Sequence, residues 1–168
     1  AAARLPVGAD TVKQAGAIAE ALVSAGMTDA AVRWWRAAAD SDMEARARVW
    51  AAVVAVADEV PPDADLFKQW ARIVPAHRAQ LLAAGLAGLG RGAVSDPLPT
   101  IENDWTRALA RAAAARHAGE VMLLAAAGLH GGWANVHPDY LRRIAAALVA
   151  VGHRREARLI VAEAAVRG

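Results

Sequence analysis

The chain has 168 residues, of which 47 are alanine and none is cysteine. The absence of cysteine excludes thiolate nucleophiles, disulfide bonds and cysteine-based zinc sites. A formal net charge of +2 is too small to indicate a nucleic-acid-binding protein, and no uncharged apolar run is long enough to span a membrane. Because alanine has the highest helix propensity and aromatic residues make up only 5% of the chain, we expect an almost entirely helical fold.

Glycine and proline breaks divide the first half of the chain into five predicted helices. We expect them over residues 10–25, 28–39, 42–60, 65–73 and 76–89. Gly26 ends the first helix, and Pro61 and Pro62 end the third because proline cannot donate to the helix ladder. The residues that we assign as N-caps are Asp10, Thr28, Ser41 and either Asp63 or Asp65, with Glu44 completing a capping box behind Ser41.

Two irregular stretches separate the helices predicted in the second half. The first is GRGAVSDPLPT at 90–100, and the second is HGGWANVHP at 130–138. The helices expected around them cover 102–116, a stretch from the break near 117–119 to 129, 138–151 and 154–166, with Thr100 as an N-cap and Pro138 in a first turn. The nine helices are joined mostly by short connections, which predict antiparallel neighbours arranged as helical hairpins.

One hairpin pattern occurs more than once. The segment ALVSAGMTDAAVRWWRAAA at 21–39 resembles a second segment, ALVAVGHRREARLIVAEAA at 147–165. When Gly26 is aligned with Gly152, eight of 21 positions are identical between 18–38 and 144–164. A third copy, with its break at Arg116, places Trp105, Leu109 and Val121 at equivalent positions. We interpret the hairpin as the building unit, because a stack of hairpins buries the apolar stripe that a single hairpin leaves exposed.

The motif within this unit resembles the tetratricopeptide repeat. The matching residues are Gly26-x4-Ala31-x3-Trp35-x2-Ala38, Gly152-x4-Ala157-x3-Val161-x2-Ala164, and Trp105 on the first helix of the third copy. The chain departs from the family where Ala19 and Ala145 replace glycine, where Leu22 and Leu148 replace tyrosine, and in lacking the closing proline. The resemblance implies an all-α fold whose nine antiparallel helices stack as an α-solenoid, a right-handed superhelix.

We expect residues 1–168 to form a single helical-repeat domain that is part of a longer protein. Its hairpins are predicted at about 10–39, 42–74, 102–129 and 138–166, and an extra helix at 76–89 with the loop 90–100 interrupts them. That loop is a candidate docking element, because loops on a regular scaffold frequently carry function.

The residues that resemble metal-binding or catalytic groups also have structural interpretations. His130, His137 and Asp139 are possible metal ligands, but their spacing fits no zinc signature. We expect instead that His137 and Pro138 begin a helix, with Asp139 in its first turn and Trp133 packed into the apolar seam. The carboxylates between positions 58 and 65 are expected to cap helices and face solvent. The sequence therefore predicts neither an enzyme nor a bound metal or cofactor.

Two clusters are candidates for binding a partner. Trp34 and Trp35 point about 100° apart on a helix, so we expect different environments for them, one between hairpins and the other nearer the surface or the next repeat. Core packing of both is the favoured interpretation, and an exposed tryptophan beside Arg33 and Arg36 is the alternative that would suit a partner. The first cluster consists of these tryptophans with Arg33 and Arg36, and the second consists of Trp133, His137, Tyr140, Arg142 and Arg143. A further interpretation joins Arg142 and Arg143 to Arg154, Arg155 and Arg158 as a patch for an acidic peptide or phosphate; the alternative is an ordinary solvated face.

The sequence favours a non-enzymatic scaffold that binds a protein or peptide along the first helices of its hairpins. The alternative is an accessory helical domain of a larger bacterial enzyme, for example a cell-wall-active one, where it would shape access of the substrate. Arginine outnumbers lysine 17 to 2, which is typical of high-GC bacterial genomes. We expect a soluble bacterial protein, cytoplasmic or periplasmic, that binds no nucleic acid.

Overall fold

The computed structural model describes residues 14–92, 94–95 and 99–168. Within those ranges it contains nine α-helices and no strand, which confirms the all-α fold. The α-helices are α2 (Ala15–Ser24), α3 (Thr28–Ala37), α4 (Met43–Val53), α5 (Ala64–Ala71), α6 (Ala76–Gly88), α7 (Asp104–Ala114), α8 (Ala118–Gly128), α9 (Pro138–Ala150) and α10 (Arg154–Arg167). Two short 3₁₀ helices, η2 (Ala38–Asp40) and η3 (Trp133–Asn135), follow α3 and precede α9. No helix in the described ranges is both long and apolar enough to cross a membrane.

Several predicted N-caps are wrong, although the helices that they begin are present. Asp42 caps α4 in place of Ser41, and its carboxylate accepts a hydrogen bond from the Ala45 N–H at 2.8 Å. Asn103 caps α7 in place of Thr100, in a reciprocal capping box with Thr106. Thr28 is the first residue of α3, whose N-terminus carries no side-chain cap. The prediction of Asp63 for α5 is confirmed, and the predicted cap Asp10 lies outside the described residues.

Helix α4 ends at Val53, seven residues before the predicted end at Val60. The chain between them forms turns whose apolar residues face the core, with Val54 and Val60 fully shielded from solvent and Asp58 exposed. Arg91 supplies hydrogen-bond donors to the backbone of this segment: its guanidinium donates to the carbonyl oxygens of Ala57 and Val60 at 3.0 and 2.6 Å. A distant arginine therefore allows the backbone to leave the helix inside the core, where unpaired carbonyls are costly.

Three helix connections share one backbone geometry. They are Ala25-Gly26-Met27, Ala115-Arg116-His117 and Val151-Gly152-His153, which join α2 to α3, α7 to α8 and α9 to α10. The middle residue of each is left-handed, with φ values of 71°, 57° and 91°. In each, the middle and last N–H groups donate back to carbonyls three and five residues earlier, which is the Schellman motif. The predicted break at Arg116 is thus confirmed, and it uses the geometry of the two glycine breaks.

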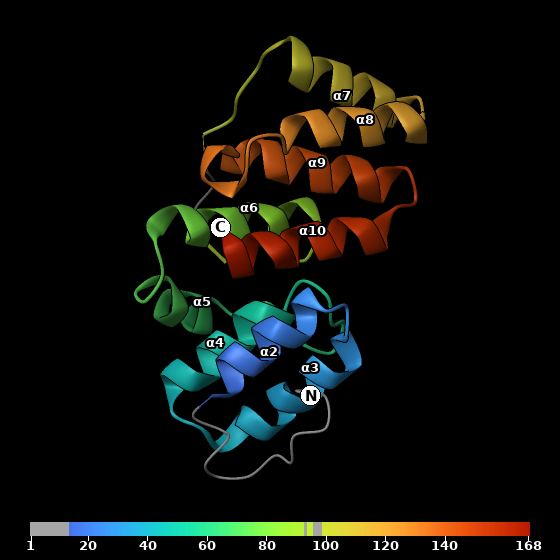
Figure 1. Ribbon diagram of the computed structural model, residues 1–168. Coiled ribbons are helices and arrows are strands. Elements are labelled where there is room, and N and C mark those ends of the chain that lie inside the picture. The colour runs from blue at the N-terminus through green and yellow to red at the C-terminus, as the bar shows by residue number, and fades with distance from the viewer. Residues whose placement is uncertain (1–13, 93, 96–98) are drawn as a thin grey trace.

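The packing order of the helices differs from their order in the chain (Figure 1). Helix α9 packs against α7 and α8 on one side and against α6 and α10 on the other. Helix α10 then contacts α2 and α4 of the N-terminal part. The α9–α10 hairpin therefore lies between the α7–α8 hairpin and the N-terminal helices, whereas in a solenoid stacked in chain order it would lie at the end.

Helix α6 fills the position beside α9 and α10 by means of two glycines. A Cβ atom added to Gly85 would lie 2.5 Å from a methyl carbon of Val161 on α10. A Cβ atom on Gly88 would lie 2.3 Å from the carbonyl oxygen of Arg142 on α9. Both glycines thus permit helix crossings that any larger residue would push apart.

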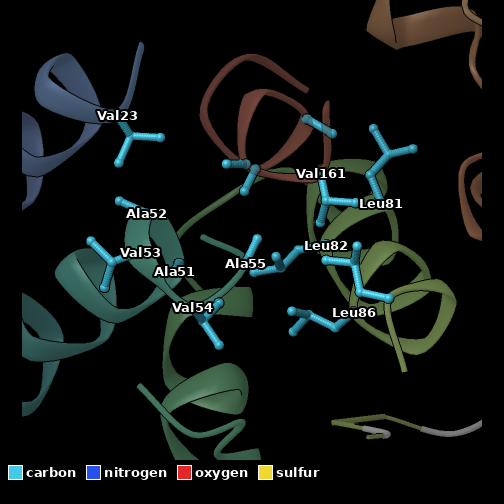
Figure 2. Close-up of a cluster of buried hydrophobic side chains, with 14 of the residues drawn as sticks. Val23, Ala51, Ala52, Val53, Val54, Ala55, Leu81, Leu82, Leu86 and Val161 are labelled. Atoms are coloured by element: carbon cyan, nitrogen blue, oxygen red, sulfur yellow. The ribbon is translucent and has the colours of Figure 1, made fainter. Parts of the chain in front are cut away.

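The core is continuous across the junction between the N-terminal helices and the rest of the molecule. Figure 2 shows the end of α4 and the turn after it facing α6 and α10. The residues labelled there are Val23 from α2, Ala51 to Ala55 from α4 and its turn, Leu81, Leu82 and Leu86 from α6, and Val161 from α10. All ten are buried, so the molecule has one core that includes both its first and its last described helices.

Candidate functional site

A cleft of about 780 Å³ is bordered by the first turns of both α3 and α10. One wall is formed by residues 26–30 and Arg33, and the other by Arg154, Arg155, Arg158 and Leu159, with Val56 between them. The cleft joins parts of the chain more than 120 residues apart, which the packing of α10 on the N-terminal helices brings together.

Both walls are helix N-termini without side-chain caps. Helices α3 and α10 begin at Thr28 and Arg154, directly after the Schellman connections. Met27 and His153 occupy their N-cap positions, and neither caps its helix with a side chain. The first backbone N–H groups of a helix have no partner within the helix and carry its positive dipole end. Two such ends border the same cleft and favour negative charge there.

Arginine dominates the charge of the cleft. Arg33, Arg154, Arg155 and Arg158 line it, and among the described residues of its lining only Asp29 carries a carboxylate. Arg154 and Arg155 are exposed, and in the part of the chain that the structure describes neither forms an ion pair or a side-chain hydrogen bond. Their guanidinium groups are therefore available to a ligand.

Arg158 is held in position by Asp58, in the turn after α4. The carboxylate of Asp58 bonds to both terminal nitrogens of Arg158, at 3.1 Å to one of them, and to Arg91 at 3.1 Å. The hydrogen bonds from Arg158 lower the pKa of Asp58, and the charges of Arg158 and Arg91 contribute, against a smaller opposing effect of burial. Burial and the charge of Arg158 lower the pKa of Arg91, while Asp58 opposes them. Asp58 thus fixes the orientation of Arg158 beside the cleft.

The cleft continues along α10 as a groove with an apolar section. Met27 and Leu159 line the cleft with 42% and 36% of their surface exposed. A second hollow, of about 260 Å³, shares Gly26 and Leu159 with the first and extends between α2 and α10. It is lined in addition by Val23, Ser24, Glu163 and Arg167. We call the two hollows together the α3–α10 groove.

The cluster predicted around the two tryptophans is divided by the structure. Trp34 is buried, whereas Trp35 is half-buried with the Arg46 guanidinium 5.3 Å from its ring centre, so the two environments differ as predicted. Arg36 is paired with Glu59 at 3.1 Å on the surface. Of this cluster, only Arg33 lines the α3–α10 groove.

The second predicted cluster stabilises the start of α9. His137 caps this helix through Nδ1, which accepts a hydrogen bond from the Asp139 N–H at 3.1 Å, and Pro138 follows it as predicted. Tyr140 packs on Trp105 with ring centres 4.6 Å apart and accepts a hydrogen bond from Asn103 at 2.6 Å. Trp133 is half-buried, and its carbonyl lies 3.1 Å from His77 Nε2 on α6.

Arg142 and Arg143 bind the buried carboxylate of Asp139. Arg142 Nε and Arg143 Nε each donate to it at 2.8 Å, and the Ile101 N–H donates at 2.9 Å. Burial opposes ionisation, but these three hydrogen-bond donors outweigh it and lower the pKa of Asp139. Hydrogen bonding to Asp139 in turn raises the pKa of Arg143, against a smaller effect of burial, with Glu102 also contributing. Asp139 thus connects the segment before α7 to the start of α9.

The five arginines considered as one patch belong to two places. Arg142 and Arg143 form ion pairs with Asp139, whereas Arg154, Arg155 and Arg158 line the α3–α10 groove. A third hollow, of about 280 Å³, lies between α7 and α9, which are first helices of their hairpins. Five of its nine lining residues are alanines, and its two charged residues are Arg142 and Arg143. The predicted first-helix face therefore offers a smaller hollow with no uncommitted charge.

The sequence missed that the first turns of α3 and α10 border one cleft, and it missed the role of Asp58. The basic residues themselves were visible, but no local pattern places residue 158 beside residue 58. Within the described ranges, no three histidine or acidic side chains are grouped to hold a metal ion, and His130 is exposed in the loop before α9. No family model, curated protein or solved structure matches the chain.

Proposed function

We propose that the chain is a non-enzymatic helical-repeat scaffold, similar in its unit to tetratricopeptide repeats, that binds a segment of another protein in the α3–α10 groove. The observation that carries this proposal is the combination of an open groove with two uncommitted arginines and exposed apolar side chains. Grooves with an apolar floor and a few convergent polar groups are the usual binding sites of proteins. The groove is lined mainly by α3 and α10, the second helices of their hairpins, so we propose binding there and not along the first helices.

The repeated connection supports the scaffold interpretation. The three Schellman connections at Gly26, Arg116 and Gly152 present the second helix of each hairpin in the same way. In the first and last hairpins, the connection places an uncapped helix N-terminus, that of α3 or α10, beside the groove. A scaffold built from hairpins thereby creates a binding site between units, which none of the units contains alone.

The test is selection of ligands from a display library of random short peptides on the immobilised protein. Enriched peptides are then measured against the wild type, Leu159→Gln and the control Leu123→Gln. Leu159 lines both hollows of the groove, whereas Leu123 is 75% exposed on α8, away from it. We expect Leu159→Gln to weaken binding about fivefold or more, because burying a leucine contributes about 1.5–3 kcal/mol, and Leu123→Gln to bind like the wild type. Failure to enrich any peptide, or equal binding by all three proteins, contradicts the proposal.

A further inference from the structure

The charges of the α3–α10 groove select among protein segments. Among the described residues of its wider hollow, four are arginines (Arg33, Arg154, Arg155 and Arg158) and one, Asp29, is a carboxylate. Asp58 offsets part of the charge of Arg158 from behind, but Arg154 and Arg155 have no ionic partner in the described ranges. The uncapped N-termini of α3 and α10 add hydrogen-bond donors and a positive field.

We infer that the bound segment is acidic, with carboxylates against Arg154 and Arg155 and one large apolar side chain against Leu159. This inference rests on the proposed function, because it names the chemistry of the segment in the same groove. Arginine suits such a partner, since its guanidinium donates two parallel hydrogen bonds to a carboxylate. Asp58 already orients the guanidinium of Arg158, so this charge is ordered before a ligand binds.

The apolar part of the ligand follows from the narrower hollow. Leu159 lies in both hollows, and Val23 lines the narrower one. Charge there is balanced internally, because Glu163 and Arg167 form an ion pair at 3.2 Å. An apolar residue beside the carboxylates therefore fits this end of the groove, and further acidic residues do not.

The same features favour a peptide over nucleic acid. None of the described residues that line the two hollows is aromatic, so bases find no ring there on which to stack. The two arginines without an ionic partner, Arg154 and Arg155, lie in the wider hollow, which Asp29 also lines, whereas Arg167 in the narrower hollow is paired with Glu163. Phosphate backbones need a longer stripe of positive charge than this.

The experiment measures binding of three labelled peptides by fluorescence anisotropy. The acidic peptide has glutamates on both sides of one leucine, and the other two replace the glutamates with glutamine or with lysine. We expect the acidic peptide to bind about tenfold or more tightly than the glutamine peptide, with affinity that falls as salt rises. Arg155→Glu should weaken this binding about fivefold or more, whereas Arg111→Glu, on the exposed face of α7, should not change it.

A charge exchange completes the test. The double variant Arg154→Glu/Arg155→Glu should lose the acidic peptide and gain the lysine peptide, an outcome that misfolding cannot produce. Equal binding of the acidic and glutamine peptides, with sensitivity to Leu159→Gln, overturns the acidic assignment and leaves the scaffold proposal standing. Tighter binding of a single-stranded oligonucleotide than of the acidic peptide also overturns it. If neither these nor any library peptide binds, the proposed function itself fails.

Discussion

The guanidinium of Arg158 on α10 bonds to the carboxylate of Asp58, which precedes it by 100 residues and lies in the turn after α4. Asp58 also accepts a hydrogen bond from Arg91, whose other terminal nitrogen supports the buried turn. One exposed carboxylate therefore links the last hairpin, the segment after α6 and the N-terminal helices. This link lies directly behind the proposed binding groove.

The first prediction concerns the strength of that link. Asp58 is 74% exposed, so a double-mutant cycle of Asp58→Ala and Arg158→Ala should give a coupling of at most about 1 kcal/mol. Chemical denaturation in low and high salt measures it, and the coupling should shrink in high salt. A coupling of several kcal/mol that is independent of salt contradicts a mainly orienting role for Asp58.

The buried carboxylate of Asp139 should be far more important for stability. Asp139→Asn leaves Arg142 and Arg143 without their shared anion, and we expect a loss of about 3 kcal/mol in the free energy of unfolding, as for broken buried ion pairs. Denaturation of the variant and the wild type at neutral pH measures this loss. A change below about 1 kcal/mol contradicts the assignment.

The acid dependence of stability should also change in Asp139→Asn. The folded protein lowers the pKa of Asp139, so its ionised form stabilises the fold fully above the ordinary aspartate pKa of about 4. That contribution is lost as pH falls below 4 and through the lower pKa of the folded state. Thermal melting from pH 7 to pH 2 should therefore show a steeper loss for the wild type than for the variant, and parallel curves contradict the prediction.

Gly88 should tolerate no side chain. A Cβ atom there would approach the Arg142 carbonyl oxygen at 2.3 Å and the Ala145 Cβ at 2.9 Å, so Gly88→Ala should destabilise the protein by about 2 kcal/mol despite the better helix propensity of alanine. Gly119→Ala is the matched control, because nothing lies within 4 Å of its added Cβ. The control should be neutral or stabilising by up to about 1 kcal/mol. Equal effects of the two changes would show that α6 and α9 do not cross closely.

Arg116 is a strained member of the three connections. It is the non-glycine residue with positive φ in the described ranges, at 57°, where Gly26 and Gly152 occupy equivalent places. We expect Arg116→Gly to stabilise the protein by up to about 1 kcal/mol, since a left-handed conformation costs about 1–2 kcal/mol for residues with a Cβ. The reciprocal change Gly152→Ala should destabilise it by a similar amount. Thermal melting checks both, and the same sign for both variants contradicts a shared geometry.

The sequence predicted the helices well where their signals are local. The breaks at Gly26, Arg116 and Gly152 depend on backbone bonds within a few residues. The glycines themselves indicated two of these breaks, and the repeat register indicated the third. The end of α4 was missed because its buried turn is completed by Arg91, more than 30 residues later. No local signal in the chain indicates that carbonyl partner.

The candidate site was predicted only in its parts. Arg33 was a candidate, and Arg154, Arg155 and Arg158 were considered as a patch, but their common groove depends on α10 packing against α2 and α4. Alanine-rich faces are similar from helix to helix, so the alanine pattern does not predict which hairpins become neighbours. The order of packing, and with it the groove, required the three-dimensional structure.

The most direct measurement is amide hydrogen exchange of the protein with and without a peptide selected from the library. The account predicts slower exchange in the first turns of α3 and α10, at residues 28–31 and 154–157, and in the neighbouring groove, with little change in α7 and α8. Protection in the hollow between α7 and α9, with none at the starts of α3 and α10, would contradict it and would place binding on the first helices of the hairpins.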